Sequence, residues 1–118
     1  MYNLRQGMTD LKAIEFCGDS LNALRKFPEA GRRRAGQQLY MVQRGYEPDD
    51  WKPMNSVGAG VREIRIRDER SIFRVMYVTK FGNTIYVLHC FQKKAQKTSP
   101  ADLETAKRRY KELRKEMA

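Results

Sequence analysis

The chain has 118 residues and a mass of 13.9 kDa, which is the size of a single domain, taken here as residues 1–118. It carries 24 Lys and Arg against 14 Asp and Glu, a formal net charge of +10, and 41% of its residues are hydrophobic. This composition excludes a disordered polar chain, and no apolar run approaches the ~20 residues of a membrane span. The N-terminus lacks a signal-peptide apolar block and both cysteines stand alone, so we expect a soluble, cytoplasmic protein.

The first half of the chain predicts one strand and two helices. Residues 1–10 are expected to form a ragged extension, and whether Met1 or Met8 is the native start stays open. LKAIEF at 11–16 alternates as a half-buried strand does. Asp19 or Ser20 can cap a short helix, and Pro28 begins a second helix that runs to about Arg44. Gly45 suits the turn that ends this helix.

The second half predicts a loop, three strands and a helix. Residues 45–60 contain two prolines and three glycines, which favour irregular structure. Strand-like runs at 61–67, 72–79 and 83–91 are separated by gaps short enough for hairpins. Ser99, Pro100 and Asp102 form a capping motif before a basic helix with an apolar stripe. The expected fold is α+β: a small antiparallel sheet of an N-terminal strand and a three-strand meander, with two N-terminal helices and a C-terminal helix.

Several kinds of active site are excluded by what the chain lacks. One His and two isolated Cys cannot build a zinc site, and there is no phosphate-binding loop or nucleophile elbow, so we expect no metal and no cofactor. His89 lies inside YVLHCF, where a structural histidine is the better interpretation.

The positive charge is concentrated in the second half and predicts a polyanionic partner. Residues 61–118 have 15 basic and 7 acidic side chains, a net charge of +8, against +2 for residues 1–60. Arg65 in the first meander strand, Arg74 in the second and the run QKKAQK after Phe91 can bring cations to one sheet face. The alternatives are that Arg74 only pairs with Glu63 or Asp68, and that the basic surface is merely solvated.

Such cations could cleave RNA without a metal or a histidine. Arginines would stabilise the charge that develops when a 2′-OH attacks the adjacent phosphodiester, and a lysine crowded by cations could help to move protons. Aromatic side chains such as Phe91 or Tyr110 could stack on bases.

Several segments resemble the phage-derived Gp49-like, HigB-like toxins of the RelE/ParE superfamily. They are DWKPM at 50–54, GVREIRI at 60–66, FRV at 73–75 and YVLHCFQKK at 86–94, and the similarity extends over about residues 12–112. The resemblance implies a type II toxin that acts as a ribosome-dependent endoribonuclease on translated mRNA. It also implies a helix-turn-helix antitoxin as partner, alongside the ribosome and mRNA.

The same resemblance, together with the basic and aromatic residues described above, suggests roles for individual residues. Arg65, Arg74 and Lys94 are the expected catalytic residues, and the expected RNA-binding residues are Arg67, Phe91, Lys93 and Lys97. The family's C-terminal acid or base has no clear counterpart, because Tyr110 lies deep in a predicted helix. Codon preference stays open, as do two alternative functions: a non-catalytic nucleic-acid-binding factor and a gyrase poison.

Overall fold

The computed structural model describes residues 11–118 of the chain. The elements in chain order are β1 (Ala13–Phe16), α2 (Ser20–Arg25), α3 (Glu29–Gln43), β2 (Trp51–Pro53), β3 (Arg62–Arg67), β4 (Ile72–Val78), β5 (Thr84–Lys93) and α4 (Pro100–Met117). The α+β class is therefore confirmed, and the N-terminal extension predicted at residues 1–10 lies outside the described residues.

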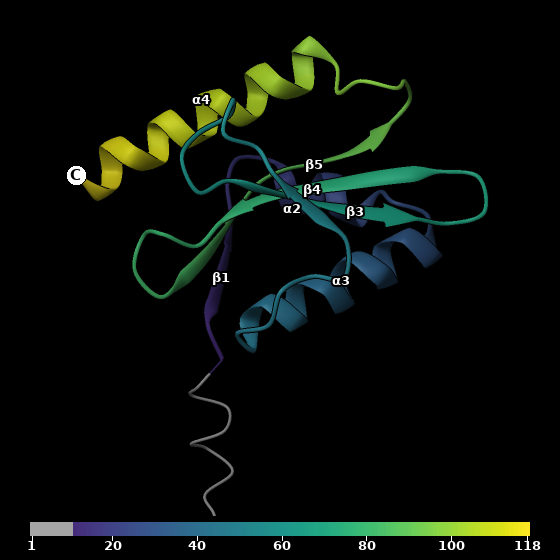
Figure 1. Cartoon of the computed structure of the whole chain (residues 1–118), viewed down its shortest axis with the longest axis horizontal. Helices are drawn as coiled ribbons and strands as arrows, with labels where there is room; N and C mark the ends of the chain where they lie inside the picture. Colours follow the sequence, from purple (N-terminus) through teal and green to yellow (C-terminus); the bar gives the residue numbers. More distant parts are fainter. Residues whose placement is uncertain (1–10) are drawn as a thin grey trace, which may run out of the picture.

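The five strands form one mixed sheet in the order β1-β5-β4-β3-β2. The predicted meander is present, with antiparallel pairing of β3, β4 and β5. The expectation of an all-antiparallel sheet is wrong for β1, which pairs with β5 in parallel from Ala13↔Thr84 to Phe16↔Val87. The helices carry the chain from β1 to the opposite edge, and the meander then returns strand by strand until β5 lies beside β1 (Figure 1).

A short edge strand lies where the sequence predicts only a loop. Trp51–Pro53 pairs antiparallel with the start of β3, from Trp51↔Ile64 to Pro53↔Arg62. Proline is tolerated here because an edge strand does not need every N–H group. The guanidinium of Arg62 lies 4.0 Å from the centre of the Trp51 ring and adds a cation–π contact between the two strands.

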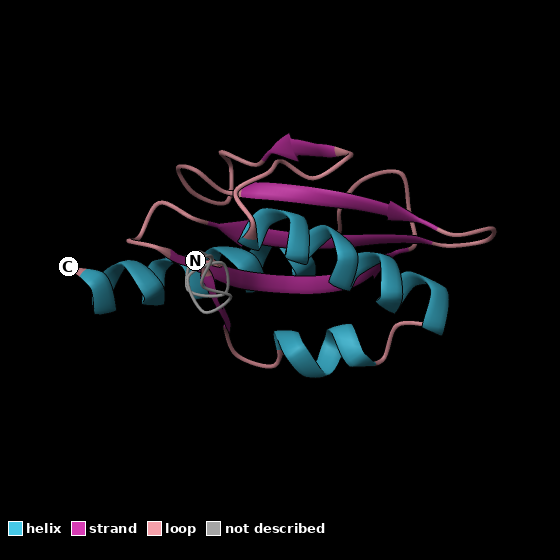
Figure 2. Cartoon of the chain, turned by 90° about the horizontal axis from the view of Figure 1, so that it is seen from below, coloured by secondary structure: helices cyan, strands magenta, loops and turns pink. Residues whose placement is uncertain are grey.

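Helices cover both faces of the sheet, with α2 and α3 on one side and α4 on the other (Figures 1 and 2). Two apolar clusters result. The cluster beneath α2 and α3 includes Leu39, Ile64, Phe73, Val75 and Val87. The cluster beneath α4 includes Met76, Val78, Leu88, Ala106 and Tyr110. Because side chains alternate along β4, some of them pack into one cluster and the others into the second. This central strand is therefore buried along almost its whole length.

The ends of α3 and α4 follow the signals in the sequence. Ser99 caps α4 by accepting a hydrogen bond from the Asp102 N–H at 3.1 Å, and Pro100 is the first residue of the helix. Gly45 follows α3 with a φ of 89°, and its N–H bonds to the carbonyl of Val42 at 3.0 Å.

Polar contacts fix α4 over the sheet. The pairing of β4 with β5 is irregular between Met76, which pairs with His89, and Tyr77, which pairs with Val87. Leu88 is therefore an extra residue in β5. His89 Nε2 lies 2.7 Å from Asp102 Oδ1, and Arg109 donates to the carbonyl of Leu88 at 2.9 Å. Arg109 also bonds Asp19 at 2.5 Å, and the Asp19 side chain makes no cap bond to α2. The structural interpretation of His89 is therefore supported.

Among residues 11–118, no helix combines the length and the apolar character that crossing a membrane would require.

Candidate functional site

The side of the sheet that faces α4 is apolar along one part of its strands and positively charged along the other. Beneath α4 it presents Met76 and Leu88, but farther along it presents arginines. The register places Arg65 directly opposite Arg74, and Arg74 opposite Phe91. Like charges opposite one another destabilise a sheet, so this arrangement costs stability and suggests a functional reason for the pair.

Arg74 lies at the centre of this charged region. Only 5% of its side chain is exposed, and its Nε lies 3.2 Å from Oε1 of Glu63, whose side chain is fully buried. Burial lowers the pKa of Arg74 below its usual value, while the negative charge of Glu63 acts in the opposite direction. An arginine remains protonated under such conditions, so a buried positive charge is available here. The predicted alternative, a pair between Arg74 and Glu63, is thus present.

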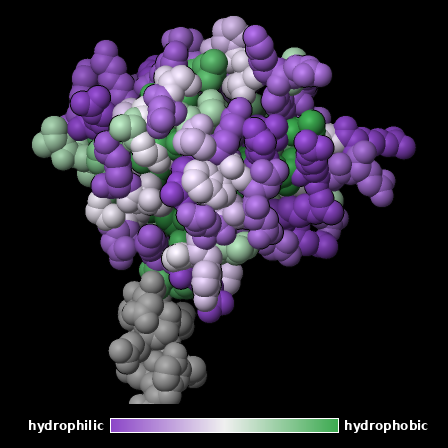
Figure 3. Space-filling model, in the orientation of Figure 1, coloured by the Kyte–Doolittle hydropathy of each residue, from purple (hydrophilic) through white to green (hydrophobic). Residues whose placement is uncertain are grey.

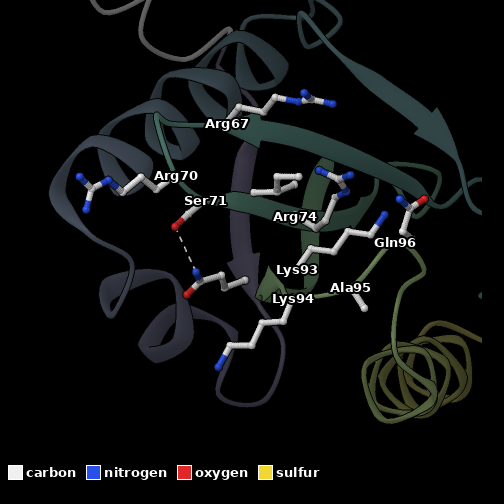
Figure 4. Close-up of a pocket in the computed structure, with 10 residues that line it drawn as sticks. Arg67, Arg70, Ser71, Arg74, Lys93, Lys94, Ala95 and Gln96 are labelled. Carbon is white, nitrogen blue, oxygen red and sulfur yellow. Dashed lines mark hydrogen bonds between the residues drawn. The ribbon is translucent and has the colours of Figure 1, made fainter.

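The strand β5 extends farther than the sequence predicts, to Lys93 rather than to Phe91. Because side chains alternate along a strand, Lys93 falls on the same face as Phe91 and Arg74. Figure 4 shows the Lys93 side chain reaching toward Arg74, whereas Lys94 points away from it. Lys94 was expected beside Arg74, but the lysine that the structure places there is Lys93.

An open cavity of about 790 Å³ lies at this end of the sheet, between the β3–β4 turn and the segment after β5 (Figure 4). None of the lining residues found in the described part of the chain is acidic. They are Arg67, Arg70, Ser71, Ile72, Arg74, Gln92, Lys93, Lys94, Ala95 and Gln96. Five positive side chains around one cavity would attract a phosphate group.

Crowding alters the protonation of Lys93. Partial burial lowers its pKa below the usual lysine value, and the positive charges of Arg74, Lys52 and Arg65 lower it further, whereas Glu63 raises it. The proton of Lys93 is therefore held less tightly than that of an ordinary lysine.

The remaining expected residues are distributed around this centre. Arg67 is exposed and lines the cavity, and Arg65 lines an adjoining one with Asp50. Lys97 is exposed in the loop after β5 and lines a smaller cavity that also includes Lys93. The structure brings Arg65, Arg67, Arg74 and Lys93 together, whereas Lys97 lies to one side.

Two aromatic residues do not fit the expected role in base stacking. Phe91 is 7% exposed and its ring stacks on His89 with centroids 5.0 Å apart, so little of it is free to meet a base. Tyr110 is 5% exposed and donates a hydrogen bond to the Ala59 carbonyl at 2.8 Å. Both are core residues because they lie beneath α4 or on its buried side.

Sequence reasoning missed Lys52, whose Nζ lies 3.9 Å from Oε1 of Glu63. The residue lies on β2, a strand that was not predicted from the sequence because prolines and glycines surround it. The alternation of Glu63, Arg65 and Arg67 was visible in the sequence, but the complete burial of Glu63 was not.

The fold and the site together define a small, basic α+β domain with a cavity of positive side chains at one end of its sheet. The sequence model of the phage-derived Gp49-like protein family matches residues 22–111, and the chain belongs to that family. The family is part of the RelE/HigB-like group of toxins from toxin–antitoxin systems, which implies an antitoxin partner. No curated protein matches the chain.

Proposed function

We propose that this protein is a HigB-like toxin that cleaves translated mRNA on the ribosome, with the scissile phosphate bound in the cavity beside β4 and β5. The observation that carries this proposal is the convergence of Arg65, Arg74 and Lys93 from three neighbouring strands. A phosphodiester gains negative charge as it is attacked, and preorganised cations stabilise that charge.

The proposed reaction uses the RNA's own nucleophile. The 2′-oxygen forms a bond to phosphorus while the bond to the 5′-oxygen breaks, which leaves a cyclic phosphate and a 5′-hydroxyl. Arg74 and Arg65 hold the non-bridging oxygens, and protonated Lys93 contacts the phosphate and is placed to give a proton to the leaving oxygen. The 2′-proton passes to solvent water, because none of the described residues that line the cavity is acidic or a histidine.

His89 is not assigned a role in this proton transfer. Its Nε2 lies 2.7 Å from Asp102, and its ring is stacked on Phe91. These contacts support a role in holding α4 on β5. The proposed mechanism therefore relies on arginine and lysine alone.

Arg74→Ala tests the proposal directly. Losing a preorganised donor slows catalysis by about 10²–10³-fold, so the variant should cleave mRNA on translating ribosomes that much more slowly and should relieve growth arrest. EDTA should leave wild-type cleavage unchanged. Thermal melts establish that the variant is folded.

Arg62→Ala is the matched control, because Arg62 packs on Trp51 and pairs with Glu47 at 3.7 Å, away from the cavity. This variant should remain toxic. If folded Arg74→Ala cuts as fast as wild type, the site is wrong. If the wild-type protein binds ribosomes or nucleic acid without cutting, the non-catalytic alternative is favoured.

A further inference from the structure

Glu63 is the one acidic side chain on β3 and lies among the cations of the sheet. It shares a face with Arg65 and Arg67, and the register places it between Lys52 on β2 and Met76 on β4. Its side chain is 0% exposed. A carboxylate with no access to solvent cannot touch a substrate, so any role in the reaction must act through its neighbours.

The contacts of Glu63 are ionic. Oε1 lies 3.2 Å from Arg74 Nε and 3.9 Å from Lys52 Nζ, yet neither carboxylate oxygen has a well-aligned hydrogen-bond donor within residues 11–118. The hydrogen bond found for the Arg74 guanidinium within those residues joins Nη1 to the Phe73 carbonyl at 3.3 Å. Most of its N–H groups therefore remain free for a ligand, while the buried carboxylate holds the other side of the group.

We propose that Glu63 is a positioning residue of the site: its buried negative charge anchors the Arg74 guanidinium and offsets the mutual repulsion of Arg65, Arg74 and Lys93. This inference deepens the proposed function and rests on it. Without Glu63, three cations on adjoining strands would face one another with no opposing charge beneath them. The arginines would then turn outward toward solvent, and Lys93 would bind its proton less tightly.

The charges around Lys93 determine the direction in which its pKa changes when Glu63 is replaced. They come from β2, β3, the β3–β4 turn, β4, the β5–α4 loop and α4, and comprise Lys52, Glu63, Arg65, Arg67, Arg70, Arg74, Lys94, Lys97 and Asp102. Asp102 is already held by His89 and by the Ser99 hydroxyl, which donates to it at 2.7 Å. Removing the negative charge of Glu63 disfavours the protonated form of Lys93, so its pKa must fall.

The test is a titration of the full-length protein with the variant Glu63→Gln, which keeps the shape of the side chain and removes the charge. The pKa of Lys93, followed by NMR at its side-chain carbon and nitrogen, should fall, because the opposing negative charge of Glu63 is lost. The alkaline limb of the pH profile for mRNA cleavage should move to lower pH by the same amount. Glu63→Asp, which retains the charge, should restore most of both values.

Glu47→Gln is the matched control, because it removes an equal charge from an exposed carboxylate that pairs with Arg62. It should move neither readout. If Lys93 titrates identically in wild type and Glu63→Gln, the inference is overturned. It is also overturned if the pKa falls while the pH profile of cleavage stays in place, because Glu63 would then be structural only.

A second comparison applies if Glu63→Gln does not fold. Removing both partners of a buried ion pair is often better tolerated than removing one, so Arg74→Met is compared with Arg74→Met/Glu63→Gln. Lys93 should have the lower pKa in the double variant, and equal values would overturn the inference. These titrations need no RNA. A wild-type protein that fails to cleave mRNA would therefore refute the proposed function separately.

Discussion

Two consecutive lysines at the end of β5 show how strand alternation separates a site residue from its neighbour. Lys93 is partly buried beside Arg74, whereas Lys94 is exposed and points away from it (Figure 4). The two residues carry the same charge and lie next to each other in the chain, and both line the same cavity. A difference between their variants would therefore report position rather than total charge.

We expect Lys93→Ala to slow mRNA cleavage on translating ribosomes by about 10²-fold, because it removes a cation that contacts the phosphate. Lys94→Ala should reduce the rate much less. The measurement is the cleavage rate at saturating toxin, with circular dichroism to compare folding. Equal losses in the two variants would show that orientation at the end of β5 does not matter, and a larger loss in Lys94→Ala would restore Lys94 as the catalytic lysine.

At the scale of the element, α3 contains two glycines in different surroundings. A Cβ atom added at Gly31 would lie 2.6 Å from the ring of Phe73, a buried side chain that also packs on Phe27 with centroids 4.6 Å apart. A Cβ atom added at Gly36 would meet no atom within 4 Å. The first glycine allows the helix to approach β4 closely, and the second does not contribute to packing.

The two alanine substitutions should therefore change stability in opposite directions. Gly31→Ala gains helix propensity but overpacks the core, and we expect a net loss of about 1–2 kcal/mol in the free energy of unfolding. Gly36→Ala should raise it by about 0.4–1 kcal/mol, because alanine restricts the unfolded chain without a clash. Urea unfolding of both variants checks this expectation. A stabilised Gly31→Ala protein would mean that α3 can move away from Phe73 at little cost.

At the scale of the whole molecule, the charge is distributed unevenly over a largely hydrophilic surface. The face seen in Figure 3 is mostly hydrophilic, with hydrophobic residues in small areas between polar ones. The second half of the chain supplies a net charge of +8 of the total +10, and five of its cations surround the cavity. A polyanion that binds there would displace counterions from its own backbone.

Binding of RNA should consequently weaken as salt rises. We expect the affinity for a single-stranded RNA with 2′-O-methyl groups, which cannot be cleaved, to fall by about 10–100-fold between 50 and 200 mM salt. Fluorescence anisotropy measures this slope. Lys93→Ala should make it shallower, while Lys80→Ala, at the opposite end of β4 from the cavity, should leave it unchanged. An affinity that does not depend on salt would contradict an electrostatic interface.

The sequence by itself determined the local features of this protein. Alternating residues predicted β3, β4 and β5, and short gaps between them predicted the meander, because both signals depend on neighbours in the chain. The capping residues Ser99, Pro100 and Asp102 predicted the start of α4 for the same reason. Placing Arg65 near Arg74 followed from this meander.

Only the tertiary structure decided which strands pair at the edges and which side chains face the cavity. The short β2 forms because β3 offers it hydrogen bonds, and β1 pairs in parallel with β5, a strand far from it in the sequence. Packing against β4 extends β5 to Lys93, and this extension places Lys93 rather than Lys94 beside Arg74. The burial of Glu63 and Phe91 likewise depends on residues distant in the sequence, because a side chain's exposure is set by everything that packs over it.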